Sequence, residues 1–387
     1  DGVDKTFTKR TRAQLDAIIA NDEQDPEIAL TCTSGINDMS SLFQGKESFN
    51  QDINHWDVSQ VTTMRLMFNL CKAFNNPLNN WNVSNVTDMA GIFGNAELFN
   101  QPLNQWDVSQ VTDMEGLFFN CPSFNQPINN WDVSNAEVIG NMFWNASTFN
   151  QPLNNWDVSN VKAMFSMFRN AISFNQPIDN WNVSNVNDML LMFFGATSFN
   201  QPLNNWNVSN VERMQSMFNN ASSFDQPLNN WNVSNVQTMQ SMFKNALSFN
   251  QDISAWNFNS ANNLRGFLDY SGLSVINYDN LLESFLSQNI TDIELGAAEI
   301  GYCDQNLARE QLIDDYGWTF NGDLKAQCGE TSVPSTTPYI TTWEVTSDDL
   351  DIEIFTSSVY DYNFSVNWGD GNLNSNITQN ITHTYST

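Results

Sequence analysis

The sequence predicts an α/β solenoid, a right-handed coil of short parallel strands and short helices, capped at both ends and followed by part of a β-sandwich. Two observations support this fold class. A 25-residue period runs without insertions from residue 49 to residue 256, and each period contains a strand-like half and a helix-like half. Units that repeat in this way must stack on one another to bury their apolar faces, which favours a solenoid.

Tryptophan marks the period, and columns of Phe, Leu or Ile, and Met keep the same register. The tryptophans are Trp56, Trp81, Trp106, Trp131, Trp156, Trp181, Trp206, Trp231 and Trp256. Large apolar residues that recur at one position of every coil are expected to point inward. The four columns therefore predict one continuous core along the stack.

Each unit is expected to pair a strand with a helix, as in a leucine-rich repeat. In the unit 199–221, the apolar residues of the second half follow the spacing of one helix face. They are Val211, Met214, Met217, Phe218 and Ala221. Ser209 precedes them and suits a helix N-cap, whereas residues 199–208 are rich in Asn and predict a short parallel strand with tight turns.

The repeat pattern and its ends divide the chain into four parts. Residues 1–30 form an N-terminal cap with an amphipathic helix from Arg12, and residues 31–268 form the repeats. Residues 269–330 are expected to form a C-terminal cap of one strand and two helices. A linker rich in Thr, Ser and Pro precedes alternating segments in 331–387, which indicate strands of a β-sandwich.

The cysteines indicate one disulfide. Cys71 and Cys121 replace the usual alanine two repeats apart, so their Cα atoms would lie about 9–10 Å apart, beyond disulfide reach. Both are expected to be free and buried. Cys303 and Cys328 flank a helical stretch and could close a loop of about 25 residues as a disulfide, although two unrelated buried thiols are the alternative.

Charge and composition exclude several classes of function. The chain has 14 Lys and Arg against 43 Asp and Glu, a net charge of −29, which disfavours nucleic acid and anionic membrane surfaces. It has no apolar run of about 18 residues that could span a bilayer. Only two histidines, His55 and His383, are present, and we expect a protein that is not an enzyme and needs no cofactor.

A column of Asp or Asn directly after each tryptophan is the one candidate metal site. Its members include Asp57, Asn82, Asp107 and Asp132. Carboxylate and amide oxygens are ligands that Ca²⁺ prefers. The same side chains also cap turns, which is the favoured interpretation.

The positions at which the repeats differ from one another indicate a binding surface. With the Val of each unit as position zero, the expected helix points positions +4, +5 and +8 toward solvent, where most units carry small or polar residues. Six large apolar residues occupy these positions in consecutive units: Phe119, Trp144, Phe165, Leu190, Leu191 and Phe194. Arg169 interrupts this set. Exposed apolar clusters are typical of interaction surfaces; the alternative is that these side chains fold over a neighbouring coil.

The full repeat resembles a known family. The unit Phe-Asn-Gln-Pro-Leu-Asn-Asn-Trp-Asn-Val-Ser-Asn-Val, followed by the spaced Met, Phe, Asn and Ala, resembles the 25-residue repeat of BspA-like leucine-rich repeat surface proteins. The segments Val-Asn-Trp-Gly-Asp-Gly from Val366 and Ile-Thr-His-Thr-Tyr-Ser from Ile381 resemble the start of a PKD-like domain, which we expect to be incomplete here.

The resemblance implies an exported protein displayed on a cell surface, and it brings no catalytic motif. We therefore expect a noncatalytic extracellular scaffold for adhesion, which binds a protein or a glycan. The alternative is a structural subunit of a surface filament or secreted assembly that associates with its own copies. A third possibility is the targeting region of a larger secreted enzyme.

Overall fold

The structure, a computed structural model, describes residues 6–304, 306–326 and 328. It also describes the backbone of four strands, β7 (Asp351–Ile354), β8 (Phe364–Asn367), β9 (Leu373–Ile377) and β10 (Ile381–Thr384). The chain divides into two compact units, Asp1–Cys328 and Gly329–Thr387, and the division lies next to the expected domain boundary at residue 330.

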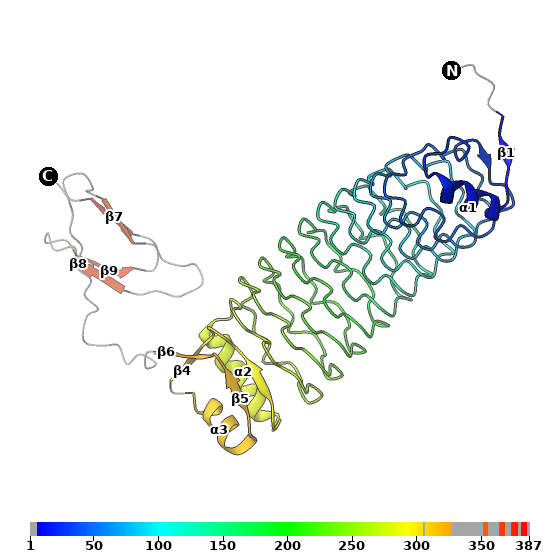
Figure 1. Cartoon of the computed structure of the whole chain (residues 1–387). Helices are drawn as coiled ribbons and strands as arrows, with labels where there is room; N and C mark the ends of the chain where they lie inside the picture. The colour runs from blue at the N-terminus through cyan, green and yellow to red at the C-terminus, as the bar shows by residue number, and fades with distance from the viewer. Residues whose placement is uncertain are drawn as a thin grey trace. The chain divides into compact units, whose positions relative to one another are not determined.

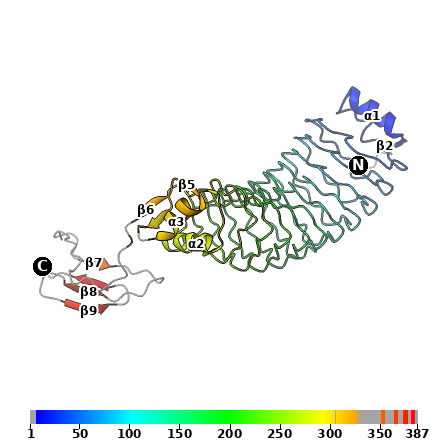
Figure 2. The ribbon, with the colours of Figure 1, turned by 90° about the horizontal axis from the view of Figure 1, so that it is seen from below.

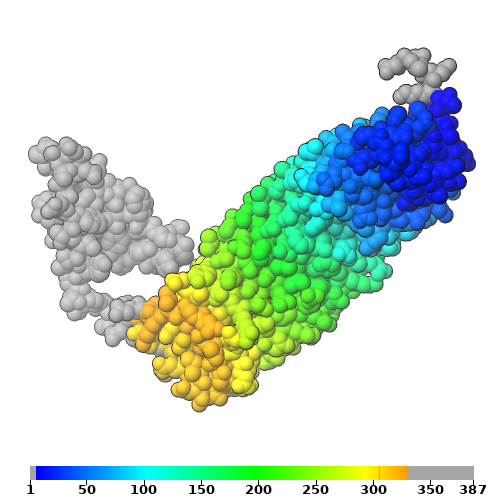
Figure 3. Space-filling view, in the orientation of Figure 1, coloured from blue at the N-terminus to red at the C-terminus, as the bar shows by residue number. Residues whose placement is uncertain are grey.

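In the first unit the repeats stack directly on one another. Parallel bridges join each residue of one column to the residue 25 positions later, starting with Asp38 to Thr63 and ending with Thr238 to Asn263. Figure 1 shows the successive coils running side by side between the two ends of the unit. On the face drawn in Figure 3, side chains fill the gaps that the ribbon leaves between coils.

The core of the stack consists of the predicted columns. The Phe, Leu or Ile, and Met columns are fully buried, and the tryptophans are at most 3% exposed. Each tryptophan of the 25-residue column from Trp81 to Trp256 donates its Nε1–H to a main-chain carbonyl of the preceding coil, as Trp156 does to Ile128 at 3.0 Å. The prediction of one continuous apolar core is therefore confirmed.

Neither the helix nor the strand predicted within each unit is present. The apolar face at +3, +6, +7 and +10 is buried as expected, but residues such as 165–170 form consecutive turns. Along these turns the backbone N–H groups alternate between two kinds of partner. Met167 N donates to Met164 O within the turn, whereas Ser166 N donates to Leu190 O of the next coil at 2.7 Å. Strand pairing is reduced to a single bridged residue in each unit.

The backbone conformation explains why no helix forms. Positions +5 and +9 of every coil have positive φ, for example 54° at both Ser166 and Asn170. Left-handed residues at this spacing interrupt an α-helix, and Gly, Asn and Ser predominate in both columns because they tolerate this region better than bulky residues. The helix prediction followed the apolar spacing and the serine that precedes it, and a series of turns reproduces both.

The N-terminal end is covered by a helix, as predicted. Helix α1 (Arg12–Asn21) begins after Thr11, whose side chain caps it, and Arg12 donates to the carbonyls of Asp38 and Ser40 in the first coil. Strand β1 (Thr8–Lys9) pairs in parallel with β2 (Thr31–Cys32). Trp56, which has no complete coil before it, has a buried Nε1 without a partner among the described residues.

The C-terminal end contains both predicted helices, α2 (Val275–Ser287) and α3 (Leu307–Tyr316). It has four short strands where one was expected. β3 (Glu294–Gly296) pairs in parallel with β5 (Thr319–Asn321), and β4 (Gly301–Cys303) with β6 (Leu324–Ala326). Figure 2 shows these elements at the end of the stack. Leu295 of β3 bridges to Leu264, so the repeat pairing continues into the cap.

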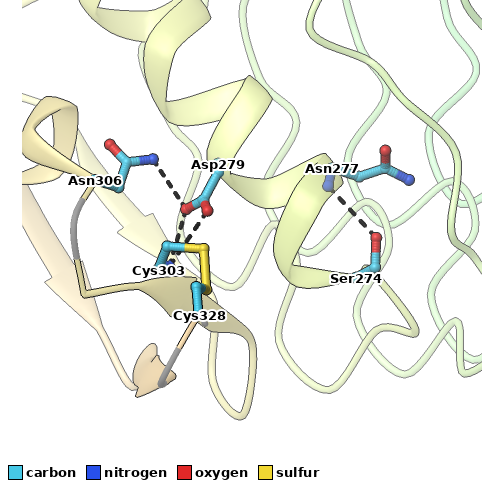
Figure 4. The surroundings of a disulfide bond; sticks show 6 residues. All are labelled: Ser274, Asn277, Asp279, Cys303, Asn306 and Cys328. Atoms are coloured by element: carbon cyan, nitrogen blue, oxygen red, sulfur yellow. Dashed lines mark hydrogen bonds between the residues drawn. A yellow bond between two sulfur atoms is a disulfide. The ribbon is translucent and has the colours of Figure 1, made fainter. Parts of the chain in front are cut away.

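Cys303 and Cys328 are joined in a disulfide, with their Cα atoms 5.1 Å apart. Figure 4 shows Asp279 of α2 beside it. There its carboxylate accepts hydrogen bonds from the Cys303 N–H and from the side-chain amide of Asn306. Cys71 and Cys121 are free and buried in the core, as predicted. Burial raises the pKa of Cys71 to about 12, so this thiol stays protonated and unreactive at neutral pH.

In the second unit the described strands form two antiparallel pairs. β7 pairs with β10, and β8 pairs with β9. The Trp-Gly-Asp-Gly part of the PKD-like motif lies outside the described residues. In the part of the chain that the structure describes, no helix is both long enough and apolar enough to cross a bilayer.

Candidate functional site

The surface on which the repeats differ most is the row of turns along one side of the stack. We call this row the turn edge. It comprises residues 40–45, 65–70, 90–95, 115–120, 140–145, 165–170, 190–195, 215–220, 240–245 and 265–270, which include positions +4 to +9 of each coil. All six residues predicted to bind a partner lie on it.

The prediction that these six side chains point freely into solvent is wrong, because each of them is half-buried. The turns follow the surface of the stack, and side chains at +4, +5 and +8 pack against a neighbouring coil, as Leu66 does against Gly91 and Asn69 against Gly94. Phe165 shows this most clearly: a Cβ atom added to Gly140 would lie 2.7 Å from its ring. For this residue the alternative interpretation, folding over a neighbouring coil, is correct.

Four residues at position +8 of consecutive coils form a continuous row in which each side chain contacts the next. The rings of Phe119 and Trp144 meet edge to face, with centroids 4.9 Å apart. The guanidinium of Arg169 lies 4.2 Å from the Trp144 centroid and 5.1 Å from that of Phe194. Arg169 therefore does not interrupt the aromatic column but joins its two parts through cation–π contacts.

Burial lowers the pKa of the Arg169 guanidinium, and its Nε is buried without a hydrogen-bond partner among the described residues. An Arg side chain stays charged in proteins, so a half-buried guanidinium needs compensating contacts. Here the rings of Trp144 and Phe194 supply them. In this +8 row Trp144 contacts both Phe119 and Arg169. Leu190 and Leu191 lie on the coil of Phe194, and Leu191 occupies a left-handed position with φ of 57°.

Beside the aromatic end of the row the turn edge is hollowed, with a volume of about 290 Å³. The floor consists of small residues at +4, +5 and +8 of two consecutive coils: Ala90, Gly91, Gly94 and Gly116. Phe119 and Trp144 line it on the later coils, and Leu66 lines it on an earlier one. Leu66 reaches over the next coil, since a Cβ on Gly91 would lie 2.6 Å from its Cδ2.

Four polar side chains also line the hollow: Arg65, Asn69, Glu115 and Asn141. Arg65 is paired with Asp113 at 3.1 Å and with Asp88 at 3.6 Å. Asn141 Nδ2 donates to Glu115 Oε1 at 3.1 Å. The hollow thus combines an aromatic wall with hydrogen-bond donors and acceptors, as small-molecule sites usually do.

The structure therefore brings together two of the six predicted residues, Phe119 and Trp144, at the hollow. Phe165, Leu190, Leu191 and Phe194 do not line it. The sequence prediction followed unusually large residues and missed the unusually small ones that create the space. A run of Ala and Gly at +4, +5 and +8 in consecutive units was the available signal.

The Asp or Asn after each tryptophan caps a turn. Asp57 Oδ1 accepts hydrogen bonds from the N–H of Ser59 at 3.1 Å and from its hydroxyl at 2.7 Å, and Asn82 makes the same pair with Ser84. Asp and Asn interchange in this column because one side-chain oxygen suffices. These hydrogen bonds lower the pKa of Asp57 and of Asp132. Binding of Ca²⁺ along the column stays a prediction.

One group of three potential metal ligands lies together in the described part of the chain: Asp279, Cys303 and Cys328. Both sulfurs are joined in the disulfide, so only the Asp279 carboxylate remains as a free ligand. A disulfide sulfur is not a thiolate, the form in which cysteine binds metals. With the disulfide formed, this group serves the C-terminal cap.

Comparison with known proteins identifies a repeat family. The family described as "Mycoplasma protein of unknown function, DUF285" matches three overlapping stretches, residues 17–121, 101–201 and 175–278. Together they run from residue 17 to residue 278, more than half of the chain, and the chain belongs to this family. Its description names no activity. The comparison with curated proteins gave no match.

Proposed function

We propose that the chain is a noncatalytic binding protein of an extracellular cell surface, in which the repeat stack holds the hollow and its aromatic wall toward a partner. One observation carries this proposal: Phe119 and Trp144 stand beside a hollow on the turn edge, outside the core columns. The same +8 position holds Asn69 and Asn219 in other coils, so the repeat does not require aromatic rings there.

In this proposal the repeats form a leucine-rich-repeat-like solenoid related to the BspA-like surface proteins, and residues 331–387 form a PKD-like module. The Cys303–Cys328 disulfide favours an oxidising compartment, where such bonds persist. The net charge of −29 keeps the protein soluble and discourages nonspecific contact with anionic surfaces.

The rival function is that of a structural subunit whose partner is another copy of the chain. The third is the targeting region of a larger secreted enzyme. Adhesion is favoured over self-association because the hollow is a concave site with both polar and aromatic lining. Such a lining suits a ligand whose chemistry differs from that of the turn edge on a second copy of the chain.

Beads coated with the 387-residue chain test this proposal. They are expected to attach to bacterial or animal cells rather than cluster with one another. Trp144→Asn, which introduces the residue found at +8 in other coils, should weaken attachment about tenfold, because aromatic side chains dominate binding hot spots.

The matched control is Leu247→Asn, which also replaces an apolar side chain with Asn but lies outside the turn edge, where Leu247 is 64% exposed. It should attach as the unmodified chain does. Clustering of the beads in place of attachment to cells would favour the structural subunit. Equal attachment by the Trp144→Asn beads would contradict the proposed surface.

A further inference from the structure

We infer that the hollow binds one uncharged sugar ring of a glycan, held against Phe119 by the polar groups of the surrounding coils. This inference rests on the proposed function and names the class of ligand that the binding surface takes. It is carried by the size of the hollow, the chemistry of its lining and its balance of charge.

The size of the hollow suits a single ring. Its volume of about 290 Å³ lies just below the range of roughly 300–1,000 Å³ that is typical of small-molecule sites. At Gly91 and Gly94 the side chains of Leu66 and Asn69 already cover the backbone, whereas at Gly116 the backbone stays open to a ligand. Gly116 has a φ of 61°, and a Cβ atom there would meet only the Cβ of Phe119, at 3.5 Å.

The lining offers both surfaces that a sugar ring presents. The aromatic wall is apolar and carries negative charge on its ring faces, which suits the C–H face of a sugar. Around it stand an amide, Asn69, a carboxylate, Glu115, and a second amide, Asn141. Asn141 uses its Nδ2 to donate to Glu115, so within the described residues its Oδ1 remains as an acceptor. Hydroxyl groups can both donate to and accept from such a set.

The charges of the hollow disfavour an ionic ligand of either sign. Arg65 is already paired with Asp88 and Asp113, and Glu115 carries its own negative charge. An anion would therefore meet no free cation there and would approach a chain of net charge −29. A cation would share the Glu115 carboxylate with Asn141 and would find the Trp144 ring already occupied by the Arg169 guanidinium. An uncharged ligand avoids both costs.

A buried aromatic side chain from a partner protein is the competing occupant. It would fill the apolar part of the hollow but would cover Asn69, Glu115 and Asn141 without supplying hydrogen bonds. Polar groups that lose water without gaining a hydrogen-bond partner weaken binding. The polar lining therefore favours a hydroxylated ring over an apolar anchor.

Binding to immobilised oligosaccharides tests the inference with the full chain. The probes are neutral tetrasaccharides of glucose, galactose or mannose, an acidic tetramer of galacturonate, a cationic tetramer of glucosamine, and a peptide library rich in Phe and Leu. We expect the chain to bind at least one neutral tetrasaccharide. Gly116→Asn should reduce that binding about tenfold, because the added side chain occupies the hollow.

Asn suits position 116 because Asn141 occupies the same left-handed position in the next coil, with φ of 57°. The matched control is Ser216→Asn, at the same position of a coil outside the hollow, where φ is 53°. It should bind as the unmodified chain does. Ala90→Gln serves as a second filling variant, since Gln215 and Gln240 occupy that column elsewhere.

Four results would overturn the inference. They are binding of no neutral tetrasaccharide, binding of only a charged tetramer, binding of only peptides, and unchanged binding by both filling variants with unchanged melting temperatures. Its failure is distinguishable from failure of the proposed function. If coated beads still attach to cells through Trp144 while no neutral tetrasaccharide binds, the binding surface stands and its ligand is of another class.

Discussion

Replacing Trp156 with alanine is expected to lower the free energy of unfolding by about 3–5 kcal/mol, the usual cost of truncating a large buried aromatic residue. Trp156 is 3% exposed and stacks on Trp181, with ring centroids 6.4 Å apart. Its removal also deprives the Ile128 carbonyl of one donor. Because each coil contacts mainly its neighbours, the loss should loosen adjacent coils as well.

Urea unfolding followed by circular dichroism measures this change. Asp157→Asn is the matched control, because the next residue in the chain is Asp or Asn in every coil and caps its turn equally well with either. The control should change stability by less than about 0.5 kcal/mol. A Trp156→Ala protein as stable as the control would contradict the placement of the tryptophan column in the core.

Replacing Asp323 with alanine is expected to cost about 3–5 kcal/mol, since it leaves a partly buried charge without its partner. The Asp323 side chain is 2% exposed and accepts two hydrogen bonds from Arg309, at 2.6 and 2.9 Å. It also accepts one from the hydroxyl of Tyr278, which is fully buried. Arg309 would remain stacked on the rings of Tyr302 and Phe320 with no counter-charge.

The control is Glu294→Gln, which breaks the pair with Arg265 at the same end of the stack. That pair is more exposed, with Arg265 at 66% and Glu294 at 36%, so its loss should cost about 1 kcal/mol or less. Thermal unfolding of the two variants checks the comparison. Equal melting temperatures would show that the Asp323 network does not hold the C-terminal cap.

The buried side of every coil was predictable from the sequence, because inward positions must be apolar whatever the backbone does. The local backbone was not. Apolar residues at +3, +6, +7 and +10 fit a helix and fit a series of turns equally well. The distinguishing signal was the Gly, Asn and Ser at +5 and +9, which tolerate positive φ. Leu66, Leu70 and Leu191 occupy the same left-handed positions and obscured it.

The candidate site was predictable only in part, for a related reason. Large residues at unusual positions are visible in a sequence, so Phe119 and Trp144 were found. A hollow is formed by missing side chains, and its extent depends on how Leu66 and Phe119 lean across neighbouring coils. The link from Trp144 through Arg169 to Phe194 likewise required the turn geometry, because the charge of Arg169 had suggested a break in the column.

Hydroxyl-radical footprinting of the chain, free and attached to a cell surface, tests most directly whether the turn edge is the binding surface. Oxidation of Phe119 and Trp144 is expected to fall on attachment. Ile172 and Leu247, which are 46% and 64% exposed and lie outside the turn edge, should be oxidised as in the free protein. Protection of Ile172 and Leu247 with unchanged oxidation of Phe119 and Trp144 would contradict the account.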